Sequence, residues 1–173
     1  MIATGADRTL ALLEAQVGRP LTDVETPVAV IDLDRLEANL TDLQSYADEH
    51  GIALWPHAKT HKSPEIGRRQ LELGAAGLTV AKTGEAQVFQ EAGVPKLLVH
   101  YPPFGEAKWE RLADIAAAGV ELTIAVDSSE PAEGLARTFA RRGLSAELLV
   151  ELDVGMHRTG QTTVAGAVGI AEQ

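Results

Sequence analysis

The segment Trp55-Pro-His-Ala-Lys-Thr-His-Lys62 brings two histidines and two lysines to the end of a short apolar run. In an extended chain Lys59 shares a face with His57, because successive side chains of a strand alternate between its two faces. A lysine held among low-dielectric walls loses its charge easily, since desolvation disfavours the ammonium form. Its neutral amine can then form a Schiff base with an aldehyde. The alternative is that Lys59 and Lys62 are ordinary solvated loop lysines, which composition alone favours.

His57 and His61 are four residues apart, which on a helix is the spacing of a zinc-binding pair. Pro56 and the strand pattern around it disfavour a helix at this place. We therefore do not expect this pair to bind a metal ion.

A second polar cluster, Glu151-Leu-Asp-Val-Gly-Met-His-Arg-Thr-Gly160, follows the last apolar run. Alternation places Glu151 and Asp153 on one face, and Arg158 follows between two glycines. The pattern is typical of a charge network around a bound anion or cofactor. It is equally typical of a structural ion pair at the rim of a domain.

Three other polar residues end apolar runs and carry weaker signals. Alternation places Lys82 with outward-facing aliphatic side chains, so we expect it to be solvated. His100 precedes two prolines and either lines a pocket or packs against neighbours. Asp127 either caps the next helix or contacts a ligand.

A repeating pattern of strands and helices must position these residues. Apolar runs begin near Val28, Ile52, Leu78, Leu97, Leu122 and Ser145. Helical spacing appears between them, and the segments 85–92, 106–118 and 130–142 are each followed by glycine. A further helix is expected over residues 10–16. Strands that alternate with helices in this way predict βαβ units and a parallel sheet.

Two helix starts can be predicted from capping residues. Asp34 is expected to cap a helix whose Leu36, Leu40 and Leu43 share one face. Ser63 is expected to cap the next helix, because Pro64 suits the first helical position and an acidic residue follows it.

Alternation within the strands favours a barrel over a doubly wound sheet. In residues 121–127 one face is aliphatic, while the other becomes polar toward the carboxyl end, and residues 146–153 show the same trend. A doubly wound sheet needs apolar residues on both faces. A closed βα barrel has an interior that opens to solvent at the carboxyl ends of its strands, where active sites lie.

Composition excludes several classes of function. The chain has 173 residues and a formal net charge of −10, which argues against a general affinity for nucleic acid or anionic lipid. It has no cysteine, and therefore no disulfide, thiolate zinc site or catalytic thiol. No membrane span, secretory signal, phosphate-binding glycine motif or serine-hydrolase motif is present. We expect a soluble, cytoplasmic protein.

Five segments together are similar to a known family: Thr26–Asp34, Pro56–Lys62, Ala81–Ala86, His100–Gly105 and Glu151–Gly160. They resemble the D-threonine aldolase and D-serine dehydratase group of the alanine-racemase-like, fold-type III enzymes, which use pyridoxal phosphate. The resemblance covers about residues 20 to 165, and Pro-His-x-Lys-Thr-His-Lys is its most specific motif. It implies an α/β fold, the (β/α)8 TIM-type barrel of the alanine racemase N-terminal domain. Here that barrel would be incomplete, with about five or six βα units.

The resemblance also implies roles for individual residues. Lys59 is expected to carry the cofactor as a Schiff base and then to act as a base or an acid. Arg158 is expected near the cofactor ring, and His57 and Thr60 are expected to line the cofactor site. A divalent metal, zinc or manganese, is expected to bind in a C-terminal domain, so no metal ligand is assigned in this chain.

By the same resemblance, residues 1–25 form an N-terminal helix and connection, and residues 26–173 form a partial barrel. The remaining strands, the phosphate-binding turn and a β domain are expected outside the chain. A strand at Ala29–Leu33 is expected to pair with that β domain, so that the barrel itself begins at Ile52. The family commonly has arginine where Trp55 stands, and we expect this ring to change contacts with the cofactor or substrate.

The implied activity is that of a homodimeric lyase acting on β-hydroxy D-amino acids, with D-threonine aldolase preferred. D-serine dehydratase and an amino-acid racemase are the alternatives within the family. A barrel that carries pyridoxal phosphate without turnover, and an interaction module without ligand, are the non-enzyme alternatives. For the 173-residue chain alone we expect weak cofactor binding and no turnover.

Overall fold

A computed structural model describes residues 5–173 of the chain, with side chains described from residue 9 onward. The chain divides into two compact units, Met1–Glu37 and Ala38–Gln173. No helix among the described residues is both long and apolar enough to cross a membrane.

The first unit contains helix α1 (Gly5–Glu14), the short 3-10 helix η1 (Leu21–Asp23) and the beginning of helix α2 (Leu33–Glu49). Residues 28–32 have no regular structure and Leu33 already begins α2, so the strand expected at Ala29–Leu33 would have to end before Leu33, and its pairing with a β domain stays a prediction. An extended segment becomes a strand only when a neighbour takes up its backbone hydrogen bonds, and no described strand pairs with this one. The cap of α2 also differs from expectation. Asp32, two residues before Asp34, accepts the hydrogen bond from the Arg35 amide at 3.0 Å.

The second unit is built on a parallel four-stranded sheet in the order β1 (Leu78–Val80), β2 (Lys96–Val99), β3 (Glu121–Val126), β4 (Glu147–Val150). Helix α3 (Pro64–Leu73) precedes it. The strands are followed in turn by α4 (Thr83–Glu91), α5 (Glu106–Ala117), α6 (Ser129–Arg141) and α7 (Val164–Ala171). The predicted alternation of parallel strands with helices is confirmed from β1 onward. So is the cap of α3, since the Ser63 hydroxyl accepts a hydrogen bond from the Ile66 amide.

Residues 54–58 run beside β1 as a fifth member of the sheet, although only His57 pairs formally, with Thr79. The Ala58 amide donates to the Thr79 carbonyl and the Thr79 amide donates to the Pro56 carbonyl, both at 2.8 Å. Pro56 has no N–H of its own to extend the ladder, which is one reason why the expected strand over residues 52–59 is so short.

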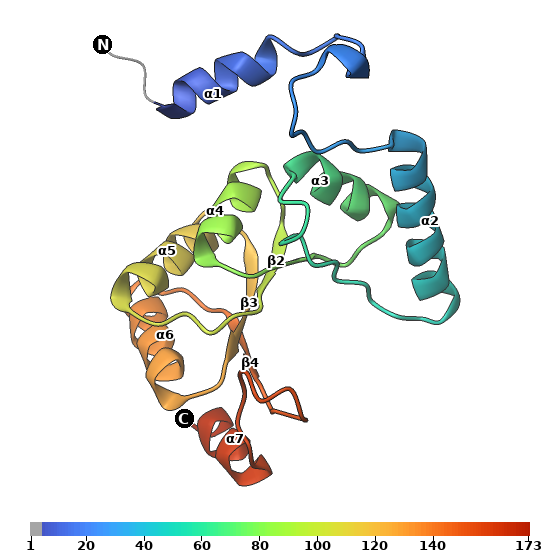
Figure 1. Ribbon diagram of the computed structural model, residues 1–173. Coiled ribbons are helices and arrows are strands. Elements are labelled where there is room, and N and C mark those ends of the chain that lie inside the picture. Colours follow the sequence, from blue (N-terminus) through green and yellow to red (C-terminus); the bar gives the residue numbers. More distant parts are fainter. Residues whose placement is uncertain (1–4) are drawn as a thin grey trace. The chain divides into compact units, whose positions relative to one another are not determined.

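Helices α4, α5 and α6 cover one face of the sheet (Figure 1). The residues of β1, β2 and β3 on that face are fully or almost fully buried: Leu78, Val80, Leu97, Val99, Leu122, Ile124 and Val126. They form one core cluster with Phe89, Leu112 and Phe139 of the helices. The aliphatic face predicted for β3 is therefore confirmed. The residues that alternate with them point to the other face of the sheet, and the polar side chains of the strands are among these residues.

Candidate active site

The polar residues at the carboxyl ends of the strands meet at one edge of the sheet. His57 lies beside β1, His100 directly follows β2, Asp127 follows β3, and Glu151 follows β4. Because all strands are parallel, their carboxyl ends lie at the same edge. The sheet thus gathers side chains that are far apart in the sequence.

His100 is the centre of this cluster. Its Nε2 lies 3.3 Å from Nη2 of Arg158, and its Nδ1 lies 3.7 Å from Oε1 of Glu151. The ring of His57 meets the ring of His100 edge-on, with centroids 5.8 Å apart. A guanidinium group can only donate, so Nε2 of His100 accepts and its proton is on Nδ1, facing the carboxylate. The structure therefore joins the predicted residues His57 and Arg158 through His100, for which the sequence left pocket lining and packing open.

Ala125 on β3 is small enough for His100 and Glu151 to meet across that strand. It has the parity opposite to Ile124 and Val126, so its methyl group lies on the same face as the two polar side chains. The Glu151 amide donates to the Val126 carbonyl at 2.9 Å, which holds the start of this loop against β3. Parity alone could have identified His100, because it alternates with the core residues Leu97 and Val99.

Two buried polar atoms of the cluster have no hydrogen-bond partner among the described residues, Nε2 of His57 and Oε2 of Glu151. The Lys59 amide donates to Nδ1 of His57 at 3.3 Å, so a neutral His57 carries its proton on Nε2. Burial, followed by the charge of Lys59, lowers the pKa of His57 below its ordinary value, which keeps the ring neutral near pH 7. A buried donor and a buried acceptor without partners are unusual in a folded protein, and they suit a bound polar molecule.

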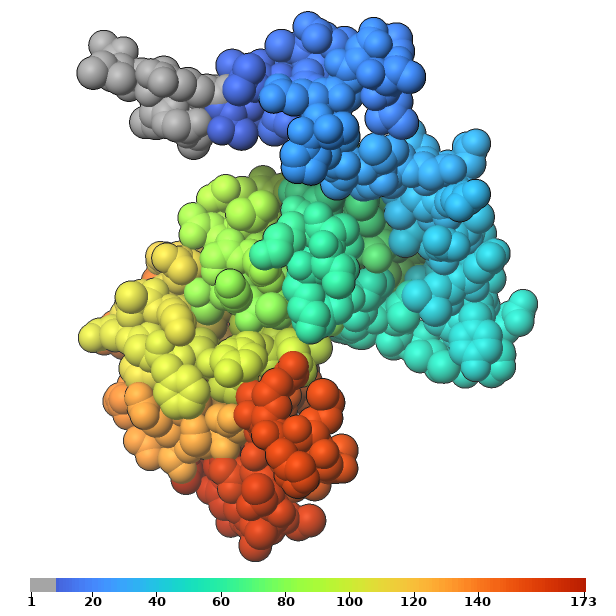
Figure 2. All heavy atoms as spheres, in the orientation of Figure 1, coloured from blue at the N-terminus to red at the C-terminus, as the bar shows by residue number. Residues whose placement is uncertain are grey.

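Lys59 and Thr60 lie in the turn that follows His57, and both are exposed. The Lys59 side chain forms no hydrogen bond or ion pair with any described residue, and its exposure agrees with the alternative of a solvated lysine. Thr60 is likewise not linked to another residue of the cluster within the described part of the chain. Lys62 is different, because its Nζ pairs with Oε1 of Glu85 at 3.0 Å. In the space-filling view this segment, turquoise to green, lies at the surface (Figure 2).

The loop that carries Arg158 is held by Asp153. The Asp153 carboxylate, only 6% exposed, accepts hydrogen bonds from the amides of Gly155 and His157 at 2.9 and 3.0 Å, and contacts the His157 ring. The first of these bonds, followed by the second, lowers the pKa of Asp153. Of the two carboxylates expected on this face, Glu151 thus joins the cluster, whereas Asp153 shapes the loop.

Asp127 does not cap the following helix, which was one of the two roles considered for it. Its carbonyl accepts a hydrogen bond from the Gln161 side chain at 2.6 Å, and its carboxylate accepts one from the Ser128 hydroxyl at 3.1 Å. The N-cap of α6 is Ser128, without a side-chain cap bond. Asp127 therefore ties the end of β3 to the far side of the Arg158 loop. Lys82 is exposed, as expected.

Trp55 lies at the other end of the strands. It lines a cavity of about 450 Å³ together with Lys96 and Glu121, which begin β2 and β3. Its ring packs so closely over Gly77 that a Cβ at that glycine would come within 2.2 Å of Cζ3. His100, by contrast, follows the carboxyl end of β2, and the expectation that the Trp55 ring changes contacts with the cofactor or substrate stays a prediction.

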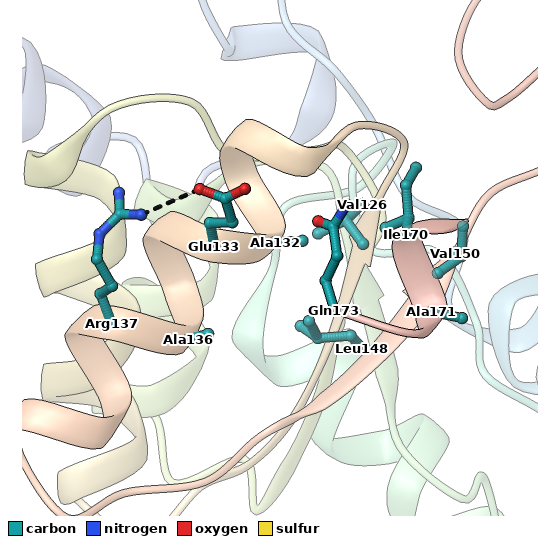
Figure 3. A pocket seen from close by; sticks show the side chains of 10 residues that line it. All are labelled: Val126, Ala132, Glu133, Ala136, Arg137, Leu148, Val150, Ile170, Ala171 and Gln173. Atoms are coloured by element: carbon teal, nitrogen blue, oxygen red, sulfur yellow. Dashed lines mark hydrogen bonds and ion pairs between the residues drawn. The ribbon is translucent and has the colours of Figure 1, made fainter. Parts of the chain in front are cut away.

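Two other features of the second unit do not add to the site. An apolar cavity of about 350 Å³ lies between α6, β4 and α7, and its charged residues, Glu133 and Arg137, pair with each other along α6 at 3.3 Å (Figure 3). Within residues 5–173, no group of three or more His, Cys, Asp or Glu side chains is arranged to hold a metal ion.

Comparison with known proteins identifies relatives of the chain. Residues 31–173 match the family model described as alanine racemase, N-terminal domain. The chain is 39% identical over 159 residues to a D-threonine aldolase of an Arthrobacter species, covering 92% of this chain and 42% of that protein. It is 34% identical over 140 residues to a D-threo-3-hydroxyaspartate dehydratase of a Delftia species, covering 81% of this chain and 37% of the relative.

The fold matches a solved structure as well. The crystal structure of D-threonine aldolase from Filomicrobium marinum superposes with a TM-score of 0.84 at 34% identity, over 88% of this chain and 41% of that one. The chain thus spans about two fifths of the length of the relatives that it matches. Its four βα units and the segment beside β1 match one part of that structure.

Proposed function

Because the chain belongs to the alanine racemase N-terminal domain family, we propose that it supplies the cofactor lysine of a pyridoxal-phosphate lyase acting on β-hydroxy D-amino acids. D-threonine cleavage to glycine and acetaldehyde is the preferred reaction, in line with the 39% identity to a D-threonine aldolase. We assign residues 26–173 to the partial barrel. The observation that carries the proposal is the unpaired, exposed Lys59 beside a neutral His57 whose buried Nε2–H lacks a partner.

The residues present fit the cofactor. Lys59 can bind its aldehyde carbon through the amine, and His57 and Thr60 flank that amine in the same turn. Pyridoxal phosphate supplies an electron sink for the bonds at Cα of the substrate, while the protein supplies orientation and charge. We place Arg158 near the ring, as the family resemblance implies.

His100 and Glu151 act on the site through Arg158. The guanidinium donates to Nε2 of His100, and Nδ1–H of His100 faces Glu151, so the carboxylate holds the imidazole in one tautomer. This order gives Arg158 a fixed orientation although its side chain is exposed. His100 and Glu151 are therefore positioning residues. His57 can hold a proton at Nε2 for a polar group of the bound molecule.

The test uses the full-length protein with pyridoxal phosphate. We expect an absorbance band of the bound cofactor and release of glycine from D-threonine, both lost in Lys59→Ala. Lys96→Ala is the matched control, because Lys96 pairs with Glu121 at the opposite end of the strands. An unchanged band in Lys59→Ala would contradict the proposal, and no glycine from any β-hydroxy D-amino acid would contradict the preferred aldolase reaction.

A dehydratase is the second candidate, because the chain is also 34% identical to a D-threo-3-hydroxyaspartate dehydratase. That reaction releases a keto acid and ammonia rather than glycine and an aldehyde, so product analysis separates the two. Racemisation would instead give the L-amino acid, and a cofactor carrier would show the band without any product. We further propose a homodimer and a divalent zinc or manganese ion as second cofactor. Light scattering and loss of activity on chelation test these two points.

A further inference from the structure

A second cavity, of about 550 Å³, lies between the starts of α4 and α5 and the loops that precede them. Its lining includes three of the five lysines in the chain, Lys62, Lys82 and Lys108, together with Arg111. The chain as a whole has a formal net charge of −10, so four cationic side chains around one cavity are a marked local excess. None of His57, Lys59, His100 or Arg158 lines it.

Only one carboxylate lines this cavity, that of Glu85, and it is already engaged. Its Oε1 pairs with Lys62 at 3.0 Å and its Oε2 accepts the Ala81 amide at 2.8 Å. Burial opposes the ionisation of Glu85, but the bonds from Lys62 and the Ala81 amide outweigh it and lower the pKa. Glu85 is therefore a carboxylate at neutral pH, and it balances Lys62 alone.

The three remaining cations have no acidic partner among the described residues. The side chains of Lys82 and Lys108 form no hydrogen bond or ion pair there, and Arg111 donates to the neutral hydroxyl of Thr83 at 3.2 Å. Like charges that line one concavity repel each other, and the same concavity concentrates anions from solution. An anion with several acceptor oxygens would relieve this repulsion.

The rest of the lining suits a ligand with an organic part. Tyr101, Pro102 and Pro103 form one wall, and the indole Nε1–H of Trp109 holds that wall by donating to the Pro103 carbonyl at 2.8 Å. On the cationic side α4 begins without a side-chain cap, and a Cβ added at Gly84 would meet nothing within 4 Å. The first-turn amides of α4 are thus open to the cavity and add to its attraction for anions.

We propose that this cavity binds the phosphate group of a small organic phosphate, at a site separate from that of the cofactor. A phosphate dianion offers oxygens in several directions, which suits cations that come from two helices. A carboxylate has two oxygens in one plane and a single charge. The proposal does not depend on the proposed lyase activity, because no residue of the candidate active site takes part.

Isothermal titration calorimetry with inorganic phosphate tests the proposal, on full-length protein that carries bound pyridoxal phosphate, has been freed of excess cofactor by gel filtration and is kept at constant ionic strength. We expect one phosphate per chain, and at least tenfold weaker binding when Lys82 and Lys108 are both changed to Ala. Lys96→Ala, which removes one lysine at the other end of the sheet, is expected to change the affinity less than twofold. Lys82 and Lys108 are exposed, so circular dichroism is expected to show unchanged folding in the double variant.

Several results would overturn the proposal. These are no phosphate binding, equal binding in the double variant and the parent, or equal weakening in Lys96→Ala. Succinate that binds as tightly as phosphate would overturn the choice of a phosphate over a carboxylate. Should the double variant fail to fold, the single variant Lys108→Glu replaces it, and the same tenfold loss is expected.

Discussion

The two faces of the sheet differ in how completely the side chains on them are packed or hydrogen-bonded within the described residues. On the helix-covered face Leu78, Leu97 and Ile124 are fully buried, and the core cluster continues into α4, α5 and α6. On the other face His57 and Glu151 keep buried polar atoms without partners. The first face provides the free energy of folding, because apolar burial there is nearly complete. On the second face these polar atoms of His57 and Glu151 form no internal hydrogen bond, so they are available to a ligand.

This contrast predicts the largest loss of stability on the covered face. Leu112→Ala removes a fully buried side chain of α5, and we expect the free energy of unfolding to fall by about 2–5 kcal/mol. Urea denaturation measures it. Leu98→Ala on the other face is the control, and its loss is expected to be smaller because Leu98 is only half-buried. Equal losses in the two variants would contradict the division of roles between the faces.

A glycine on the same covered side gives a smaller, sharper test. A Cβ at Gly134 of α6 would lie 2.4 Å from Cζ2 of Trp109, so Gly134→Ala is expected to cost about 1–3 kcal/mol through overpacking. Gly169 in α7 is the matched control, because a Cβ there meets nothing within 4 Å. Gly169→Ala is expected to stabilise by up to about 1 kcal/mol, since alanine favours helix. Thermal unfolding of both variants measures these changes. Stabilisation by Gly134→Ala would show that the contact between Gly134 and the Trp109 ring is loosely packed.

On the open face the expected change is in activity rather than in stability. Glu151→Gln keeps the shape of the side chain and removes the charge that faces His100 at 3.7 Å. We expect the free energy of unfolding to change by less than about 1 kcal/mol, while kcat falls at least tenfold and its pH profile shifts. Glu147→Gln, at the exposed start of the same strand β4 that Glu151 follows, serves as control for the loss of charge. A fall in stability with unchanged kcat would make Glu151 a structural residue.

The smallest expected effect is a pH dependence of stability. Burial lowers the pKa of both His57 and His61 below the ordinary value of 6.5. Below that pH the unfolded chain binds more protons than the folded one, so stability falls as the pH drops from about 6.5. Denaturation midpoints at pH 7.5 and 5.5 measure the slope, and His61→Gln is expected to make it shallower. A protein that gained stability on acidification over this range would contradict the assignment.

Local patterns predicted much of this molecule from sequence. The cap at Ser63, the helices after β1 to β3 and the aliphatic face of β3 follow from neighbours in the chain, and the structure confirms them. The strand expected at Ala29–Leu33 stays a prediction, because strand formation depends on a partner that these residues do not supply. The cap predicted at Asp34 is provided by Asp32 instead, two residues earlier. Several acidic residues near one helix start can each accept a hydrogen bond from a first-turn amide.

The sequence by itself determined the order of strands and helices and marked Lys59, His57, Thr60 and Arg158 as candidates, because spacing and residue type are local properties. Only the tertiary structure shows that His100 lies between Arg158 and Glu151. Only the tertiary structure shows that Trp55 lies with Lys96 and Glu121 at the amino ends of β2 and β3. Arg158 and His100 are 58 residues apart, and they meet because parallel strands bring their carboxyl ends to one edge. Contacts across that edge depend on register and on small residues such as Ala125, which no single segment encodes.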